Sequence, residues 1–134
     1  MFAEVGKSMT PIRVVCIEDE SEMIDLVSMI LSREGYQVIG APGGLQGLQM
    51  VEDTQPELIL LDLMMPDLDG WEVYQRLKSN PKTTGVPIIV VTARAQSIDK
   101  ILGLHIAKVD DYITKPFSPA ELLASVEKVL SKKN

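Results

Sequence analysis

The sequence lacks several features on which common classes of protein depend. Cys16 is the one cysteine among 134 residues, so no disulfide can form within the chain, and this suits a reducing cytoplasm. The net charge of −6 argues against direct binding of a nucleic-acid backbone by this domain. No apolar run approaches the length that spans a bilayer, and the N-terminus lacks the pattern of a signal peptide. The composition therefore predicts a cytoplasmic protein that neither enters a membrane nor binds DNA or RNA by itself.

What the chain does contain is the balance of an ordinary globular domain. Hydrophobic residues make up 46% of the sequence and charged residues 24%. A chain of this length is expected to form one domain, large enough to bury most of its apolar surface. Residues 1–10 show no periodicity, which predicts a loose leader followed by a domain over residues 11–134.

Five short apolar runs, several rich in β-branched residues, predict five strands. They cover residues 12–17, 36–39, 58–62, 88–92 and 112–114. Apolar residues at helical spacing predict helices at about residues 21–34, 45–51, 71–80, 97–106 and 119–133. Alternating strands and helices are typical of an α/β protein with a parallel sheet. The third run shows no polar alternation, as expected of a strand that is buried on both faces.

Local signals predict where several of these helices begin and end. Ser21 is expected to cap the first helix, and Gly35 to end it. Gly47 lowers helix propensity and predicts that the second helix is the weakest. Ser118 and Glu121 have the spacing of a capping box at the start of the last helix.

Charged and polar residues stand where the predicted strands end. The first strand is followed by Glu18 and Asp19, the third ends at Asp62, the fourth at Thr92, and the fifth leads to Lys115. In an open parallel sheet all strands point the same way, so these residues share one edge, where such sheets bind ligands. If the first strand lies between the second and the third, the three carboxylates cluster.

This combination of groups suits a phosphoryl group. Three neighbouring carboxylates repel one another, and some would protonate unless a cation intervenes. Their hard oxygen atoms suit Mg²⁺, which takes a few carboxylates and leaves positions open for phosphate oxygens. A lysine ammonium and a threonine hydroxyl add the positive charge and the donor that a phosphoryl group needs. One carboxylate could then act as a nucleophile and form an aspartyl phosphate.

The arrangement resembles the receiver domain of two-component response regulators, a family that includes chemotaxis regulators. The resemblance covers about Ile12 to Leu130 and rests on five signatures in the same order. They are Glu18-Asp19-Glu20, Asp62 with Met65-Pro66 and Asp69-Gly70, Thr92-Ala93, Asp110-Asp111-Tyr112, and Lys115-Pro116-Phe117. The resemblance implies a flavodoxin-like fold: a single doubly wound five-stranded parallel sheet of order 2-1-3-4-5, flanked by five helices.

The resemblance also implies roles for the acidic residues. Asp62 would accept a phosphoryl group from a phosphohistidine on a sensor histidine kinase or a phosphotransfer protein. Asp19, Asp62 and the backbone carbonyl of Met64 would bind Mg²⁺ directly, and Glu18 would act through a bound water.

Three further residues would read and transmit the phosphorylation. Lys115 would hold a phosphate oxygen, and the Lys115–Pro116 bond would be cis. Thr92 would move its hydroxyl onto the phosphate, and Tyr112 would turn inward. This would reshape the face made by the fourth helix, the fifth strand and the last helix, and so control a protein partner or an output domain. Such a domain is a signalling switch rather than an enzyme, and catalyses only its own phosphorylation and dephosphorylation.

Several positions depart from the usual pattern of the family. The stretch from Thr92 to Lys115 is one residue longer than is typical, and it reads Ala107-Lys108-Val109 where a Gly-Ala pair normally precedes the two aspartates. Glu18 stands where aspartate is commoner, and Gly47 replaces a usual alanine. Ser125 stands where receivers that pair through the face of the last helix tend to carry arginine, so that kind of salt-bridged dimer is not expected.

The remaining polar residues are expected to have structural roles. Asp67 and Asp69 would stabilise a loop and cap the third helix, and Asp110 and Asp111 would lie in a solvated turn. His105 is expected on the solvated side of the fourth helix and is assigned no function.

Two other functions compete with the phosphorylated switch. A Mg²⁺-dependent phosphohydrolase with an aspartyl nucleophile usually carries a second aspartate two residues after the first, where this chain has Met64. A receiver that only docks, without being phosphorylated, would not need the full set of chemical residues that this sequence retains.

Overall fold

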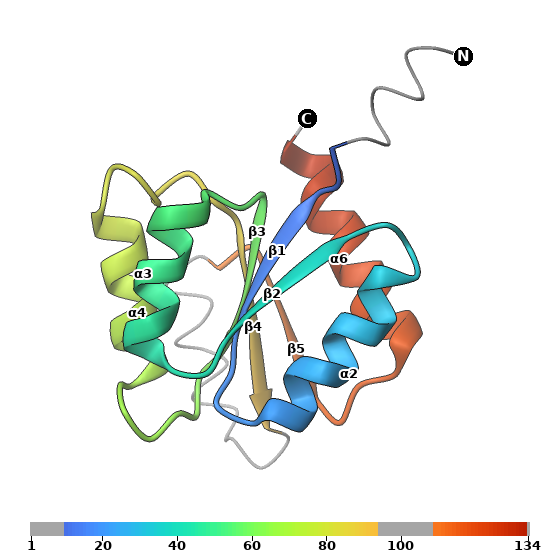
Figure 1. Cartoon of the computed structure of the whole chain (residues 1–134), viewed down its shortest axis with the longest axis horizontal. Coiled ribbons are helices and arrows are strands. Elements are labelled where there is room, and N and C mark those ends of the chain that lie inside the picture. Colours follow the sequence, from blue (N-terminus) through green and yellow to red (C-terminus); the bar gives the residue numbers. More distant parts are fainter. Residues whose placement is uncertain (1–9, 94–108, 134) are drawn as a thin grey trace.

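The computed structural model describes residues 10–93 and 109–133, and its centre is a five-stranded parallel sheet (Figure 1). The strands are β1 (Arg13–Ile17), β2 (Gln37–Ala41), β3 (Leu58–Asp62), β4 (Ile88–Ala93) and β5 (Asp111–Lys115). Their order across the sheet is β2-β1-β3-β4-β5, which confirms the predicted topology.

Helices cover both faces of the sheet, as expected of a doubly wound fold. They are α2 (Ser21–Ser32), α3 (Gly44–Thr54), α4 (Gly70–Ser79) and α6 (Pro119–Lys133). Figure 1 shows α3 and α4 together on one side of the sheet, with α2 and α6 on the other. The helix predicted at 97–106 and residues 1–9 of the leader predicted at 1–10 lie outside the described residues. Among the described residues, no helix is long and apolar enough to cross a membrane.

The core consists of two apolar clusters, one on each face of the sheet. Successive residues of β3 point to opposite faces, so Ile59 and Leu61 join one cluster while Leu58 and Leu60 join the other. All five residues of β3 are buried. This explains why the sequence of this strand shows an unbroken apolar run, and it places Asp62 at the buried end of a central strand.

Two predicted strands were too short because their ends depend on pairing with a neighbour. The strand expected at 36–39 ends at Ala41, which pairs with Ile17, and the strand expected at 112–114 ends at Lys115, which pairs with Ala93. Alternation along one strand cannot reveal such pairs, since they join residues far apart in the sequence.

The predicted cap of α2 was wrong, and the helix ends at Ser32, two residues before the predicted Glu34. Ser21 is the first helical residue, and the N-cap is Glu20, whose side chain makes no capping hydrogen bond. The amide of Glu20 instead donates to the Glu18 carboxylate at 3.2 Å, so the charge at the end of β1 organises this turn. Gly35 follows the helix with a left-handed φ of 89°, a conformation that favours glycine.

Candidate phosphorylation site

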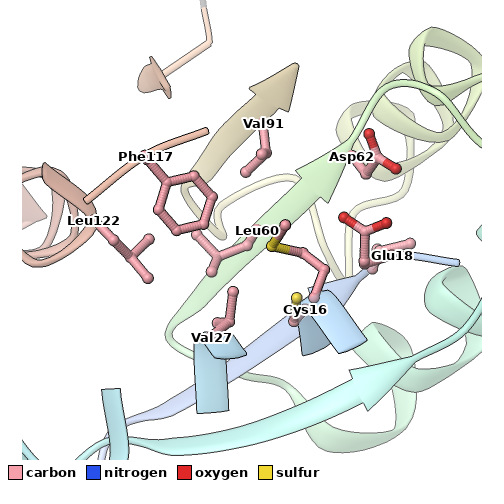
Figure 2. Close-up of a pocket in the computed structure, with 10 residues that line it drawn as sticks. Cys16, Glu18, Val27, Leu60, Asp62, Val91, Phe117 and Leu122 are labelled. Carbon is pink, nitrogen blue, oxygen red and sulfur yellow. The ribbon is translucent and has the colours of Figure 1, made fainter. Parts of the chain in front are cut away.

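The carboxyl ends of β1 and β3 bring three acidic side chains together, as the sequence predicted. Glu18 and Asp62 are only 2% and 3% exposed, and Asp19 is exposed beside them. One carboxylate oxygen from each residue lies within 4.8 Å of the other two. Figure 2 shows the Glu18 and Asp62 side chains next to each other at the ends of their strands.

Lys115 reaches this cluster from the end of β5, across the intervening strands. Its Nζ lies 2.8 Å from Glu18 Oε1, 3.6 Å from Glu20 Oε1 and 3.8 Å from Asp62 Oδ2. Burial disfavours the ammonium, but the hydrogen bond to Glu18 and the charges of Asp62, Glu18 and Glu20 outweigh it and raise the pKa of Lys115. The lysine is therefore a retained positive charge, and the Lys115–Pro116 bond that follows is cis, as predicted.

Asp62 has the ionisation behaviour of a carboxyl group that needs a cation. Burial, reinforced by the neighbouring Glu18, raises its pKa from 3.8 to about 7. The Met64 amide, which donates to Asp62 Oδ1 at 3.1 Å, and the charge of Lys115 oppose this rise. A second positive charge would favour the ionised form, and three closely spaced carboxylates are the hard oxygen donors that Mg²⁺ prefers. The residues present therefore fit a magnesium ion.

A small apolar cavity lies beside the acidic cluster, between the sheet and the helices α2 and α6 (Figure 2). Cys16, Leu60, Phe117 and Leu122 line it, with Glu18 and Asp62 also at its wall. Burial raises the pKa of the Cys16 thiol to about 12, so this cysteine is not a nucleophile at neutral pH. The reactive groups of this region are the carboxylates and the lysine.

The loop from β3 to α4, which begins after Asp62, is held in place by several contacts. Met65 is buried whereas Met64 is 55% exposed. A Cβ atom on Gly70 would lie 2.4 Å from Leu63 Cα, so the close return of the chain requires glycine there. Asp69 accepts a hydrogen bond from the Trp71 amide at 2.8 Å, which confirms its predicted role as the cap of α4.

Asp67 has a role in this loop that the sequence did not reveal. Its two carboxylate oxygens accept hydrogen bonds from the amides of Gly44 and Leu45, at 3.1 and 3.2 Å. These amides lie at the start of α3, more than twenty residues earlier in the chain. The glycines around the helix start were a signal, because they leave its first amide groups without a local side-chain acceptor.

The predicted solvated turn is confirmed for Asp110, which lies in an exposed bend, but was wrong for Asp111, which is half-buried at the start of β5. Asp110 Oδ2 accepts a hydrogen bond from the Ile88 amide at 2.7 Å, at the start of β4. Asp111 Oδ2 accepts one from Ser125 Oγ at 2.6 Å and lies 3.1 Å from Lys128 Nζ. Both acids thus tie β5 to neighbouring elements, and the burial of Ser125 explains why this position of α6 carries a small polar residue.

Of the two residues with predicted switching roles, the structure describes the side chain of Tyr112 but not that of Thr92. Tyr112 lies on β5 and is 42% exposed, so its ring is accessible at the surface. The backbone of Thr92 lies in β4, paired with Thr114, but its side chain lies outside the described part of the structure.

Comparison with known proteins decides the family. A model of the response regulator receiver domain matches residues 14–127. The chain belongs to this family. Membership places the domain among the signalling switches of two-component systems rather than among enzymes, and so favours the switch over the phosphohydrolase.

Curated relatives of this receiver domain are transcriptional regulators. It is 42% identical over 118 residues to the "DNA-binding dual master transcriptional regulator RpaA" of Synechocystis, covering 88% of this chain and 48% of that protein. It is 41% identical, with the same coverage, to the "alkaline phosphatase synthesis transcriptional regulatory protein PhoP" of Bacillus subtilis. The chain therefore spans about half the length of these relatives.

Solved structures show the same fold. A putative response regulator from Chloroflexus aurantiacus has a TM-score of 0.83 at 30% identity, with 91% of this receiver and 99% of that chain covered. A CheY-like receiver domain protein from Methanospirillum hungatei has a TM-score of 0.84 at 28% identity, with 92% and 97% covered.

Proposed function

We propose that this receiver domain takes a phosphoryl group onto Asp62 from a phosphohistidine of a sensor histidine kinase or a phosphotransfer protein. The observation that carries the proposal is the cluster of Glu18, Asp19 and Asp62 within 4.8 Å, with Lys115 beside it. Such a cluster has a high negative charge density that a divalent cation can offset, and it borders a positive charge that suits a phosphoryl oxygen.

Asp62 is better placed than Glu18 to act as the nucleophile. Glu18 is engaged on both oxygens, by Lys115 and by the Glu20 amide. Asp62 Oδ1 accepts a hydrogen bond from the Met64 amide. Asp62 Oδ2 lies 3.8 Å from Lys115 Nζ, which is beyond hydrogen-bonding distance. That oxygen can form the new bond to phosphorus as the bond from phosphorus to the histidine nitrogen breaks, and the electron pair of the broken bond returns to the imidazole.

The surrounding residues would neutralise the charge of this reaction. Asp19, Asp62, the carbonyl of Met64 and, through a water, Glu18 would hold Mg²⁺, which when bound supplies positive charge at the phosphoryl oxygens. Lys115 would leave Glu18 to hold one of those oxygens, and Thr92 would donate its hydroxyl to another.

Acetyl phosphate, a small phosphoryl donor, tests this proposal without a kinase. In the presence of Mg²⁺, the intact mass of the full chain should rise by one phosphoryl group. Asp62→Asn should not gain this mass, whereas Asp53→Asn, which removes an exposed acid from α3, should behave like the wild type. Equal labelling of the Asp62→Asn variant, or no labelling of the wild type, would overturn the proposal.

We further propose that phosphorylation controls a partner or an output domain through the face that includes β5 and α6. Tyr112 is accessible on this face and can turn inward when Thr92 moves to the phosphate. The relatives named above are DNA-binding or transcriptional regulators, and the charge of −6 on this chain indicates that any DNA contact belongs to another domain. A cytoplasmic location is consistent with such a partner.

Solvent access to Tyr112 gives a test of this switch. Phosphorylation should lower the rate at which a tyrosine-selective reagent modifies Tyr112, with Tyr36 of the same chain as an internal reference. An unchanged ratio of the two rates in fully phosphorylated protein would contradict an inward turn of Tyr112.

A further inference from the structure

The start of α3 is capped by a residue from a different part of the chain. The N-cap residue, Gly43, has no side chain, and the first turn contains no acidic residue. The amides of Gly44 and Leu45 donate instead to Asp67, in the loop after Asp62. These two hydrogen bonds hold the pKa of Asp67 below its usual value. An ionised carboxylate at the positive end of a helix is a favourable arrangement.

The contact depends on a close approach between the loop and the helix. A Cβ atom on Gly43 would lie 3.0 Å from Asp67 Oδ2, and one on Gly44 would lie 2.9 Å from Leu68 Cβ. Two consecutive glycines thus let the loop that follows β3 lie directly against the start of α3. A larger residue at either position would push the loop away.

This contact fixes the segment that contains Met64. On one side of Met64, the Leu63 amide donates to the Val91 carbonyl at 3.2 Å. On the other side, Met65 is buried and Asp67 is bound to α3. The exposed Met64 therefore lies in a short stretch of backbone that is held at both ends, next to Asp62.

We propose that Asp67 is a positioning residue for the metal and phosphoryl site: by binding the start of α3, it holds the Met64 backbone where its carbonyl can serve as a ligand. This inference rests on the proposed function, because it concerns the same Mg²⁺ site. Holding the loop in place before the cation arrives removes part of the ordering cost of binding, so the contact should strengthen Mg²⁺ affinity.

The test compares Asp67→Ala with Asp69→Ala in the full chain. Both variants remove one exposed acid from the same loop, but Asp69 caps its own helix, α4, through the Trp71 amide. Calorimetric titration with MgCl₂ should show that Asp67→Ala raises the Mg²⁺ dissociation constant roughly threefold to tenfold, at or below the range for outer-shell partners of metal ligands. Asp69→Ala should stay within about twofold of the wild type, because its cap is local to α4.

A conservative variant separates positioning from charge. Asp67→Asn loses the negative charge but keeps one of the two oxygens that accept hydrogen bonds, so its Mg²⁺ affinity should lie between those of the wild type and Asp67→Ala. With acetyl phosphate, the labelling rate of Asp67→Ala should recover at saturating Mg²⁺, since the variant leaves Asp62 and Lys115 intact. Hydrogen exchange without Mg²⁺ should show faster exchange at the Leu63 amide in Asp67→Ala than in Asp69→Ala.

The proposal is overturned by any of three results. The first is a Mg²⁺ affinity of Asp67→Ala within twofold of the wild type, or no Mg²⁺ binding by the wild type. The second is an equal loss in Asp69→Ala, and the third is a loss in Asp67→Ala without faster exchange at the Leu63 amide, which would show a charge effect. These titrations contain no phosphoryl donor, so they can succeed or fail independently of the labelling of Asp62.

Discussion

The helices α3 and α6 meet the same physical requirement in opposite ways. The first amide groups of any helix lack partners within the helix. In α6 they are satisfied locally, since the Glu121 amide donates to Ser118 Oγ at 3.1 Å and the Ser118 amide donates to Glu121 Oε1 at 2.8 Å. In α3 they are satisfied by Asp67, from beyond β3. The start of α6 is therefore encoded within four residues, while that of α3 depends on the folded chain.

The two helices also differ in how they attach to the sheet. Leu122, Val126 and Val129 of α6 are buried in one apolar cluster. The buried residues of α3 are Gly44, Gly47 and Val51, and a Cβ atom on Gly47 would lie 2.7 Å from three side-chain atoms of Ile17. One helix is held mainly by large side chains, and the other by the close approach of its backbone to β1.

The largest effect is expected from removing an apolar anchor of α6. Leu122→Ala should lower the free energy of unfolding by about 2–5 kcal/mol, because Leu122 is fully buried and its loss leaves a cavity. Urea unfolding measures this change, with Leu45→Ala on the exposed surface of α3 as the control. A cost below about 0.5 kcal/mol, the level of ordinary surface substitutions, would show that α6 is not anchored as described.

Gly47→Ala tests the opposite mode of attachment. Helix propensity alone predicts a gain of about 1 kcal/mol. The clash with the buried Ile17 side chain should reverse this and cost about 1–3 kcal/mol. Gly85→Ala is the matched control, since a Cβ atom there would meet nothing within 4 Å. If Gly47→Ala stabilised the protein in urea unfolding, the close approach of α3 to β1 would not constrain this position.

Ser118→Ala tests the local cap of α6. Loss of the Ser118 hydroxyl should lower the free energy of unfolding by about 1 kcal/mol, typical of an N-cap substitution. Since the partner of Ser118 is Glu121, the double variant with Glu121→Ala should cost less than the sum of the single variants. Ser131→Ala, near the other end of the helix, provides the control. Strict additivity of the two substitutions would contradict a reciprocal cap.

The smallest effect concerns the tie between β5 and α6. Burial disfavours the charge of Asp111, but the hydrogen bond from Ser125 and the contact with Lys128 outweigh it and lower the pKa of Asp111. A carboxyl whose folded pKa is depressed stabilises the protein above its unfolded pKa of about 3.9, and this stabilisation is lost as the pH falls through the folded value. Solvent screening limits the contribution of Lys128 to a few tenths of a kcal/mol.

Comparing the wild type with Asp111→Asn across pH measures this contribution. The wild type should be the more stable protein at pH 6, and the difference should shrink as the pH falls below 4, where protonation removes the charge of Asp111. Denaturant unfolding of both proteins, at pH 6 and at one pH below 4, gives the two differences in the free energy of unfolding. A difference that is the same at both values would show that the charge of Asp111 does not contribute.

Much of the site could be predicted because its residues stand at strand ends. Glu18, Asp62 and Lys115 stand at the ends of predicted strands, and parallel strands carry such residues to one edge of the sheet. The sequence could not show that Lys115 contacts Glu18 at 2.8 Å and lies farther from Asp62, at 3.8 Å. Those distances depend on side-chain lengths and on the register of strands that are not adjacent.

Sequence patterns were sufficient for the elements whose causes are local. The unbroken apolar run of β3, the glycine after α2 and the capping box of α6 each depend on a few neighbouring residues, because periodicity, backbone freedom and capping act over one or two turns. These signals were sufficient for the order of the elements and for the edge of the sheet that carries the acids.

Contacts between distant segments depend instead on the folded chain. In the sequence, three residues looked like ordinary loop acids: Asp67, Asp110 and Asp111. In the fold they accept hydrogen bonds from the start of α3, the start of β4 and Ser125, respectively. A backbone amide or a hydroxyl can donate to any nearby carboxylate, so its partner is whichever acid the fold brings to about 3 Å. The same dependence on the whole fold gives α3 its cap and fixes the loop beside Asp62.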